Sequence, residues 1–301
     1  MTGVQTCALP ISLAGFLFGF DTVVISGAEQ QIQSLWGLSA EMHGVAMASA
    51  LYGTVIGSLI GGWPTDRFGR KRTLTFIGLL YVISAVWSAL AQGAGAFILA
   101  RAIGGLGIGI STVVAPLYIS EIAPPARRGL LAGMFQFNIV FGIVIAYLSN
   151  ALLAGLGDVA WRWMLGVAAV PSVAYGLLSL ALPESPRWLL TRGKDVTGGK
   201  AVLRLIDPAA TDADIDARAA AILAAGASSK QRGNFWNASL RRPIGLAFLI
   251  AFFNQLSGIN AILYFAPRIF EMTGLASQAA LLQSVGIGVT NLIFKIGRAH
   301  V

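Results

Sequence analysis

The chain has 301 residues, of which 56% are apolar and only 11% are charged, and its mean hydropathy is +0.73. Soluble domains have about 45–50% apolar and about 25% charged residues, so these values exclude a soluble domain, a disordered or collagen-like chain, a coiled coil and a disulfide-rich secreted scaffold. The net charge of +8 does not indicate nucleic-acid binding, because most Lys and Arg residues lie in connections between apolar segments, as in cytoplasmic loops of membrane proteins.

The two ends of the chain are related at the DNA level. Residues 6–11 and residues 296–301 can be encoded by opposite strands of one oligonucleotide that resembles a sequencing-library adapter. We therefore expect residues 1–11 and 295–301 to be adapter-derived and the gene to be interrupted on both sides. Cys7, the single cysteine, then carries no information about the redox compartment.

Eight apolar segments are close to the ~20 residues that cross a bilayer as a helix. They predict an all-α, multi-pass protein of the cell membrane, in contact with the lipid bilayer. The predicted spans are 13–33, 45–63, 74–92, 96–118, 130–153, 161–181, 244–266 and 276–294.

The basic connections assign the orientation. They lie at 67–72, at 127–128 and within 182–243, which are alternate connections and therefore share the cytoplasmic side. The expected organisation is a six-helix transmembrane bundle over 12–181, a cytoplasmic linker with short helices over 182–243, and the first two helices of a second bundle over 244–294. Within the linker, the alanine-rich stretch 212–225 predicts a surface helix.

Two charged residues lie inside predicted spans. Asp21 is midway along the first span and Arg101 is near the start of the fourth. A charge at the centre of a membrane helix costs about 2.5–3.5 kcal/mol on insertion scales, so such residues usually pair or face a cavity. One interpretation is a pair in which protonation of Asp21 releases Arg101. The alternatives are a static ion pair, or an Arg101 whose guanidinium reaches the interface.

Amide side chains gather in two further spans. Asn254, Gln255 and Asn260 precede Tyr264 in the seventh span, and Gln136 lies in the fifth. Amides both donate and accept hydrogen bonds, which suits a neutral polyhydroxylated ligand; the alternative is hydrogen bonding that merely joins helices. The glycine-rich run 104–109 lacks the strand of a nucleotide-binding loop, so we interpret it as close helix packing.

Several longer strings carry a family resemblance. The segments 62–71, 116–129, 161–164, 183–189 and 255–264 resemble the signature sequences of the sugar porter family of the major facilitator superfamily. That resemblance implies a major facilitator fold, present here as the first six-helix bundle and the start of the second. Asn254 replaces the first residue of a common Gln-Gln pair, which leaves the particular sugar open.

The resemblance also implies roles for individual residues. The residues expected to contact the sugar are Phe18, Gln136, Gln255, Asn260 and Tyr264. The proton-coupling pair would be Asp21 and Arg101. The residues expected to form a cytoplasmic charge network that gates the conformational change are Asp66, Arg70, Glu121, Arg128, Glu184 and Arg187.

The predicted function is therefore proton-coupled symport of a monosaccharide or related polyol by alternating access. A facilitative uniporter and a sugar sensor that does not transport are the alternatives. An enzyme is not expected: His43 lies in a predicted outer connection and His300 in the terminal segment, so no histidine-based metal or catalytic site is predicted, and neither is a cofactor. The chain by itself is expected not to transport, and the sequence does not indicate its oligomeric state.

Overall fold

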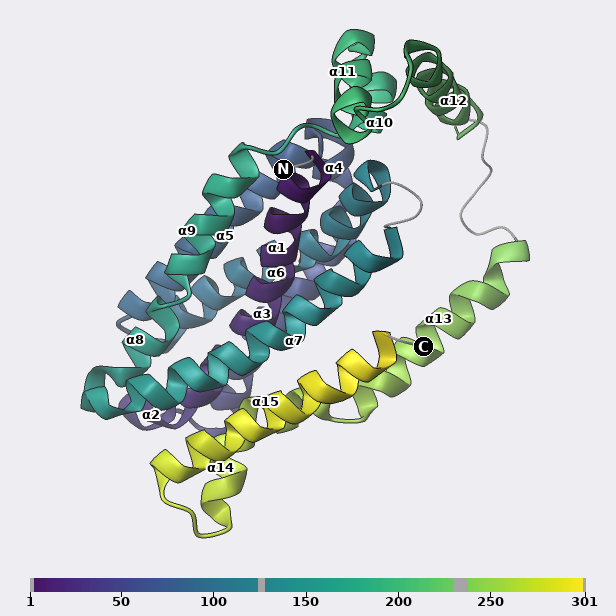
Figure 1. Ribbon diagram of the computed structural model, residues 1–301. Coiled ribbons are helices and arrows are strands. Elements are labelled where there is room, and N and C mark those ends of the chain that lie inside the picture. The colour runs from purple at the N-terminus through teal and green to yellow at the C-terminus, as the bar shows by residue number, and fades with distance from the viewer. Residues whose placement is uncertain (1–2, 124–127, 230–237, 300–301) are drawn as a thin grey trace.

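The computed structural model describes the backbone of residues 3–123, 128–229 and 238–299, and the side chains of 12–123, 129–227 and 240–295 (Figure 1). Within these ranges every regular element is a helix, which confirms the all-α prediction. Side chains of residues 1–11 and of residues from 296 onward, including most of the expected adapter-derived segments, lie outside the described residues, as does the side chain of Arg128.

The first bundle is built from long helices that lie side by side in Figure 1. The first predicted span forms α1 (Gly3–Val24), a short 3-10 turn η1 (Ile25–Gly27) and α2 (Glu29–Leu35), with a bend of 51° at the break. The helices that follow are α3 (Ala40–Ile60), α4 (Gly62–Phe68), α5 (Arg70–Leu90), α6 (Ala94–Ile122) and α7 (Arg128–Leu153).

The fifth and sixth predicted spans form one continuous apolar stretch of 52 residues, Gly129–Leu180. This stretch is more than twice the ~20 residues needed for one crossing. It turns in the 3-10 segment η3 (Ala154–Val159), where Gly157 has a φ of 67°, and returns as α8 (Ala160–Gly166) and α9 (Ala169–Leu180). Among the described residues six stretches are long and apolar enough to cross a membrane, or seven with the bent first segment, and the 52-residue stretch contains two predicted spans.

The linker forms a separate helical layer at one end of the bundle, the end predicted to be cytoplasmic (Figure 1). It contains α10 (Pro186–Trp188), a π-helical turn η4 (Leu189–Gly193), α11 (Val196–Ile206) and α12 (Asp212–Ser229). The helix expected at 212–225 is therefore confirmed. A small core of Leu190, Leu203, Ile215 and Ala219 holds these helices together.

The second group of helices begins with a discontinuous span. Helix α13 (Ala238–Leu256) and α14 (Ile259–Met272) are separated at Gly258, whose φ of 72° is readily adopted only by glycine. Helix α15 (Ser277–Ala299) follows and packs along α7, whereas α13 runs from the linker side down to α14 (Figure 1). The first and second groups therefore meet mainly through α14 and α15.

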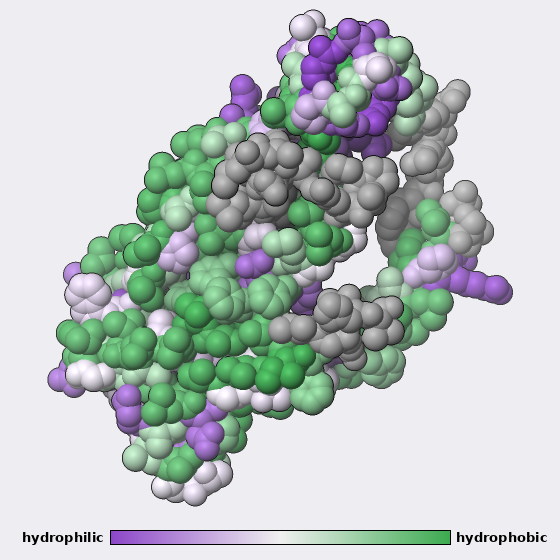
Figure 2. Space-filling model, in the orientation of Figure 1, coloured by the Kyte–Doolittle hydropathy of each residue, from purple (hydrophilic) through white to green (hydrophobic). Residues whose placement is uncertain are grey.

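The surface of the bundle is apolar, and hydrophilic residues concentrate on the linker helices (Figure 2). Leu59, Leu152 and Val170 are between 71% and 81% exposed, which suits contact with lipid rather than water. The interior contains buried aromatic residues such as Tyr118, Tyr147 and Trp161. These features, with the length of the helices, make the chain a multi-pass membrane protein.

The glycine-rich run 104–109 takes part in close helix packing, as predicted, and its partner includes α3. A Cβ on Gly105 would collide with the backbone carbonyl of Ala50, and one on Gly53 would collide with that of Ala102. Small residues let two membrane helices approach until their backbones touch, and this contact brings α6, with Arg101, into the centre of the bundle.

Candidate functional site

Asp21 and Arg101 meet inside the first bundle, joining α1 to α6. Nη1 of Arg101 donates to Oδ1 of Asp21 at 2.5 Å, and Nη2 donates to the backbone carbonyl of Asp21 at 2.9 Å. The Arg101 side chain is 2% exposed and that of Asp21 is 15% exposed. The predicted pairing of these residues is therefore confirmed, whereas their role in proton coupling stays a prediction.

This ion pair leaves part of its hydrogen-bonding capacity unused. Oδ2 of Asp21 and Nε of Arg101 are buried and have no hydrogen-bond partner among the described residues. A buried carboxylate that keeps a free oxygen retains a site where a proton can bind without first breaking every contact. The pair is thus held together at one oxygen and open at the other.

The break between α13 and α14 carries the amide residues of the seventh span. Nδ2 of Asn260 donates to Oε1 of Gln255 at 3.1 Å, across the left-handed Gly258. Gln255 is exposed and Asn260 is partly exposed, so both retain polar groups for a ligand. Discontinuous helices with free polar groups are a common way for transporters to build a substrate site near the middle of the membrane.

The other expected sugar contacts are distributed over three helices. Tyr264 lies one turn beyond Asn260 on α14 and is 5% exposed, within a core cluster that also contains Phe20 and Tyr147. Phe18 is partly buried on α1, and Gln136 is exposed on α7. The structure brings Gln255 and Asn260 into contact and gives no direct contact of Phe18 or Gln136 with them, so a shared sugar site stays a prediction.

The cytoplasmic end of the bundle contains a buried charge network centred on Arg70. Its guanidinium binds both carboxylate oxygens of Glu121, with Nε–Oε2 at 2.8 Å and Nη2–Oε1 at 2.9 Å. Nη1 also donates to the backbone carbonyl of Thr65 at 3.2 Å and to Oδ1 of Asp66 at 3.5 Å. The side chains of Arg70 and Glu121 are 7% and 2% exposed, whereas that of Asp66 is 57% exposed.

Glu184 joins this network through backbone groups rather than through an arginine side chain. Its carboxylate accepts hydrogen bonds from the backbone N–H of Arg70 at 2.8 Å and of Lys71 at 3.2 Å. These are the free N–H groups at the start of α5, where the helix dipole favours a negative charge. Glu184 thereby attaches the end of the sixth span to the start of the third.

The side chain of Arg187 is exposed and forms no hydrogen bond or ion pair with the described residues, although the backbone carbonyl of Arg187 accepts a hydrogen bond from Oγ1 of Thr191 at 2.7 Å. Together with Asp66, Arg70 and Glu121 it lines a cavity of about 880 Å³ between the bundle and the linker helices. The Arg128 side chain lies outside the described residues, so its place in the network is not assigned. Of the six residues expected in the charge network, the structure joins Asp66, Arg70, Glu121 and Glu184.

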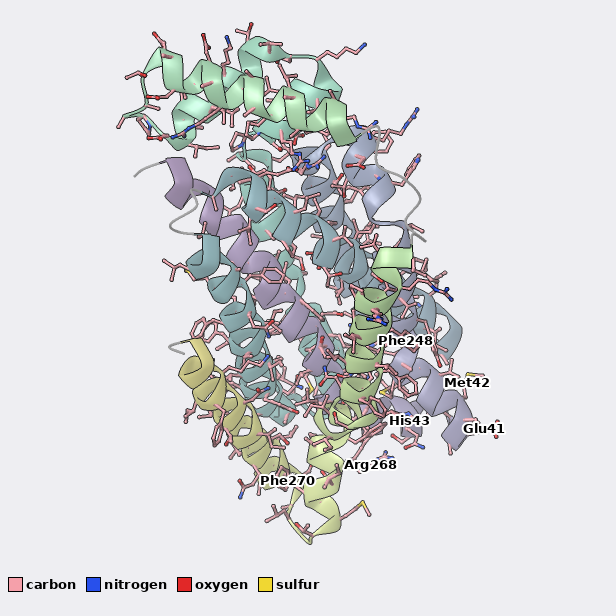
Figure 3. All side chains as sticks on the ribbon, turned by 90° about the vertical axis from the view of Figure 1, so that its right-hand side faces the viewer. Glu41, Met42, His43, Phe248, Arg268 and Phe270 are labelled. Atoms are coloured by element: carbon pink, nitrogen blue, oxygen red, sulfur yellow. The ribbon has the colours of Figure 1, made fainter. Side chains whose placement is uncertain are left out.

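A second charged cluster was not predicted. His43 lies within α3 and is 4% exposed, so its placement in an outer connection was wrong. It contacts Glu29 of α2, which in turn contacts Arg268 of α14. Figure 3 shows His43 and Arg268 at the same end of the molecule. Glu29 within the first predicted span was the available signal, because a carboxylate in an apolar segment usually has a partner. The distant partner on α14 could not be read from the sequence.

Comparison with known proteins places these features in a family. The family described as Sugar (and other) transporter matches residues 7–300. The arabinose-proton symporter of Bacillus subtilis is 38% identical and is aligned over 94% of this chain and 62% of its own length. The D-xylose-proton symporter of Escherichia coli K12 is 33% identical over 97% of this chain and 65% of its own. The chain thus spans about three fifths of the length of these relatives.

Solved structures agree with this result. The proton:xylose symporter XylE bound to 6-bromo-6-deoxy-D-glucose matches with a TM-score of 0.86 and 31% identity, over 99% of this chain and 69% of that one. A partially occluded, inward-open form of XylE from E. coli matches with a TM-score of 0.82 over 97% of this chain and 71% of that one. With the bundle, the broken seventh span and the buried charge pairs in place, the chain belongs to the sugar porter family of the major facilitator superfamily.

Proposed function

We propose that the protein is a secondary transporter that couples the movement of a monosaccharide or related polyol to that of protons. The observation that carries this proposal is the buried Asp21–Arg101 pair with its unpartnered carboxylate oxygen. The relatives named above are proton symporters of arabinose and xylose, which supports a sugar as the substrate class. A carboxylate in this position supplies a proton-binding group that a purely facilitative transporter does not need.

The pair suggests how proton binding would act on the helices. Neutralising Asp21 removes the charge that holds the Arg101 guanidinium, so the contact between α1 and α6 weakens. Arg101 then requires a new partner, because an unpaired buried charge is costly. The two protonation states would therefore favour different arrangements of the helices, and a proton can shift the population between them.

The sugar is proposed to bind at the break in the seventh span. Gln255, Asn260 and Tyr264 would supply polar groups from α13 and α14, and Phe18 on α1 and Gln136 on α7 would contribute from the first bundle. Amides suit sugar hydroxyls because each amide both donates and accepts, and aromatic rings pack against the C–H faces of a sugar. A ligand held from both groups of helices would respond to their relative movement.

The Arg70 network is proposed to act as the cytoplasmic gate. Its core, Arg70–Glu121, is buried and bidentate, whereas Asp66 and Arg187 are exposed at the cavity. Exposed ion pairs contribute about 0.2–1 kcal/mol each, which can bias a two-state equilibrium without fixing it. The exposed members are therefore the ones expected to exchange partners during gating.

The test is concentrative sugar uptake into proteoliposomes that contain the product of the source gene, whose reading frame is established by sequencing genomic DNA outward from Leu13 and Phe294. We expect accumulation of a labelled pentose or hexose only with an inward proton gradient, and its loss on addition of a protonophore. Uptake that stops at equal sugar concentrations on both sides and does not depend on the proton gradient would identify a uniporter. Binding of sugar without any uptake would identify a sensor.

A further inference from the structure

Glu29 is a buried carboxylate at the outer end of the bundle, and it takes no part in the Asp21–Arg101 ion pair. Its side chain is 1% exposed. Oε2 lies 2.8 Å from Nε2 of His43 on α3, and Oε1 lies 2.9 Å from Nε of Arg268 on α14. His43 is itself buried, and its Nδ1 has no hydrogen-bond partner among the described residues.

The arginine in this cluster comes from the second group of helices. Arg268 also donates from Nη2 to Oε1 of Gln33 at 2.6 Å, and Gln30 donates to Oε2 of Glu271 at 2.6 Å. Helix α14 is therefore attached to α2 by one ion pair and two hydrogen bonds. Glu29 and His43, by contrast, both belong to the first bundle and stay together whatever α14 does.

Movement of α14 would change the charge balance around Glu29. With α14 in place, the carboxylate has a permanent cation beside it, because arginine does not lose its proton in proteins. Without α14, a carboxylate that α2 and α3 still cover is left with only the imidazole of His43. An unpaired buried carboxylate is costly, and it is neutralised most simply by a proton, held on the carboxyl group or shared with the imidazole.

We propose that Glu29 and His43 form a second proton-binding site, at the outer end of the bundle, which takes up a proton when α14 carries Arg268 away. The inference rests on the proposed function for the movement of α14. It adds a proton-binding group that is separate from Asp21 and that responds to the pH outside the membrane.

The sign of the pH effect follows from the departing charge. Loss of the Arg268 cation makes a proton more favourable on Glu29 and also on His43, so both groups act in the same direction. The open arrangement binds more protons, and acidity therefore favours it. Glu271 leaves on the same helix, but it faces Gln30 while Arg268 contacts Glu29 directly. Two further carboxylates lie on elements next to the cluster and both are exposed: Glu41 on α3, and Asp158 on η3, which follows the Gly157 carbonyl that accepts from Gln31 of α2.

The test measures the separation of α2 and α14 in this chain, purified in lipid nanodiscs. Cys7 is replaced by serine, and spin labels are attached to the variants Ser34→Cys on α2 and Met272→Cys on α14, both at exposed positions. On lowering the pH from about 8 to about 5, we expect the longer label distance to become more populated. The ratio of open to closed forms should change by up to about tenfold per pH unit, the limit for one proton.

Two variants separate the proposal from a merely structural contact. Glu29→Gln removes the proposed proton-binding group, and Arg268→Gln keeps both proton-binding groups but removes the cation that distinguishes the two states. Arg268→Gln is expected to abolish the pH response, and Glu29→Gln is expected to reduce it to the part that His43 contributes. Both variants should favour the longer distance at every pH. The matched control Glu41→Gln changes an exposed carboxylate close to His43 and should leave the response intact. Far-ultraviolet circular dichroism establishes that each variant retains its helical content.

The proposal is overturned if the label distance does not change with pH, which includes the case of a single fixed distance. It is also overturned if either Glu29→Gln or Arg268→Gln keeps the full pH response. Asp21→Asn distinguishes the two proposals of this work. It should retain pH-dependent opening, because the outer cluster does not include Asp21. Proton-driven uptake without pH-dependent opening would overturn only the outer site, whereas pH-dependent opening without proton-driven uptake would overturn only the proposed symport.

Discussion

Gly69 and Glu184 lie so close together that the glycine has no room for a side chain. A Cβ on Gly69 would collide with the carboxylate of Glu184, and the φ of 92° at Gly69 is one that only glycine adopts readily. The tight turn exposes the first N–H groups of α5, and the carboxylate accepts from two of them. The fold of the cytoplasmic loop and the position of the charge network are thus set by the same residue.

Gly69→Ala is therefore expected to destabilise the protein. Strain at a backbone conformation of this kind costs about 1–3 kcal/mol, and displacement of Glu184 adds to it. Thermal unfolding in detergent measures the effect. Gly62→Ala is the matched control, since nothing lies within 4 Å of a Cβ there and its φ is not positive. Equal stability of the two variants would contradict the assigned role of Gly69.

Glu121→Gln should disrupt the cytoplasmic network strongly. Removing one partner of a buried ion pair leaves the other charge uncompensated, which costs about 3–5 kcal/mol. Hydrogen exchange across α4 and the start of α5 should accelerate, because Arg70 holds both elements. Asp216→Asn breaks the exposed Lys200–Asp216 pair of the linker and serves as the control, with an expected loss of at most about 1 kcal/mol. If Glu121→Gln lowers the free energy of unfolding no more than the control does, the Arg70–Glu121 ion pair is dispensable for stability.

Asp21→Asn in the product of the source gene should abolish concentrative uptake and leave sugar exchange partly intact. Asparagine keeps the size and one acceptor oxygen for Arg101 but does not take up a proton near neutral pH. Uptake and exchange of the same labelled sugar are compared in proteoliposomes. Unchanged accumulation would remove Asp21 from the coupling mechanism.

Gln255→Ala should weaken sugar binding by about 1–3 kcal/mol, the usual cost when a buried partner loses its hydrogen bond. The variant also removes the acceptor for Nδ2 of Asn260, so both amides at the break are affected. Isothermal titration calorimetry with the preferred sugar measures the change. Ser257→Ala is the control, because that hydroxyl already donates to the backbone carbonyl of Asn254, three residues earlier. Equal affinity in the two variants would exclude Gln255 from the site.

Much of the fold follows from local properties of the sequence. The lengths of the apolar segments predicted the spans, and the small residues of 104–109 predicted close helix packing, although not that α3 would be the partner. Both are consequences of neighbouring residues and of the hydrophobic thickness of a bilayer, so one sequence suffices. The bend at Gly27–Ala28 and the division of the seventh span at Gly258 were not predicted, because a glycine within an apolar run allows a break without requiring one.

The candidate sites likewise combine contacts that the sequence predicted with contacts that it did not. Asp21 and Arg101 stood out in the sequence because ionisable residues are rare in membrane helices, and their pairing is the simplest way to offset two buried charges. The capping of α5 by Glu184 and the contact of Glu29 with Arg268, 239 positions later, depend on how distant helices pack. Composition and spacing therefore determined that this is a multi-pass membrane protein with charges inside it, since burial in lipid acts on each segment separately. Only the tertiary structure decided which charges meet, because a partner is chosen by distance in space and not by distance along the chain.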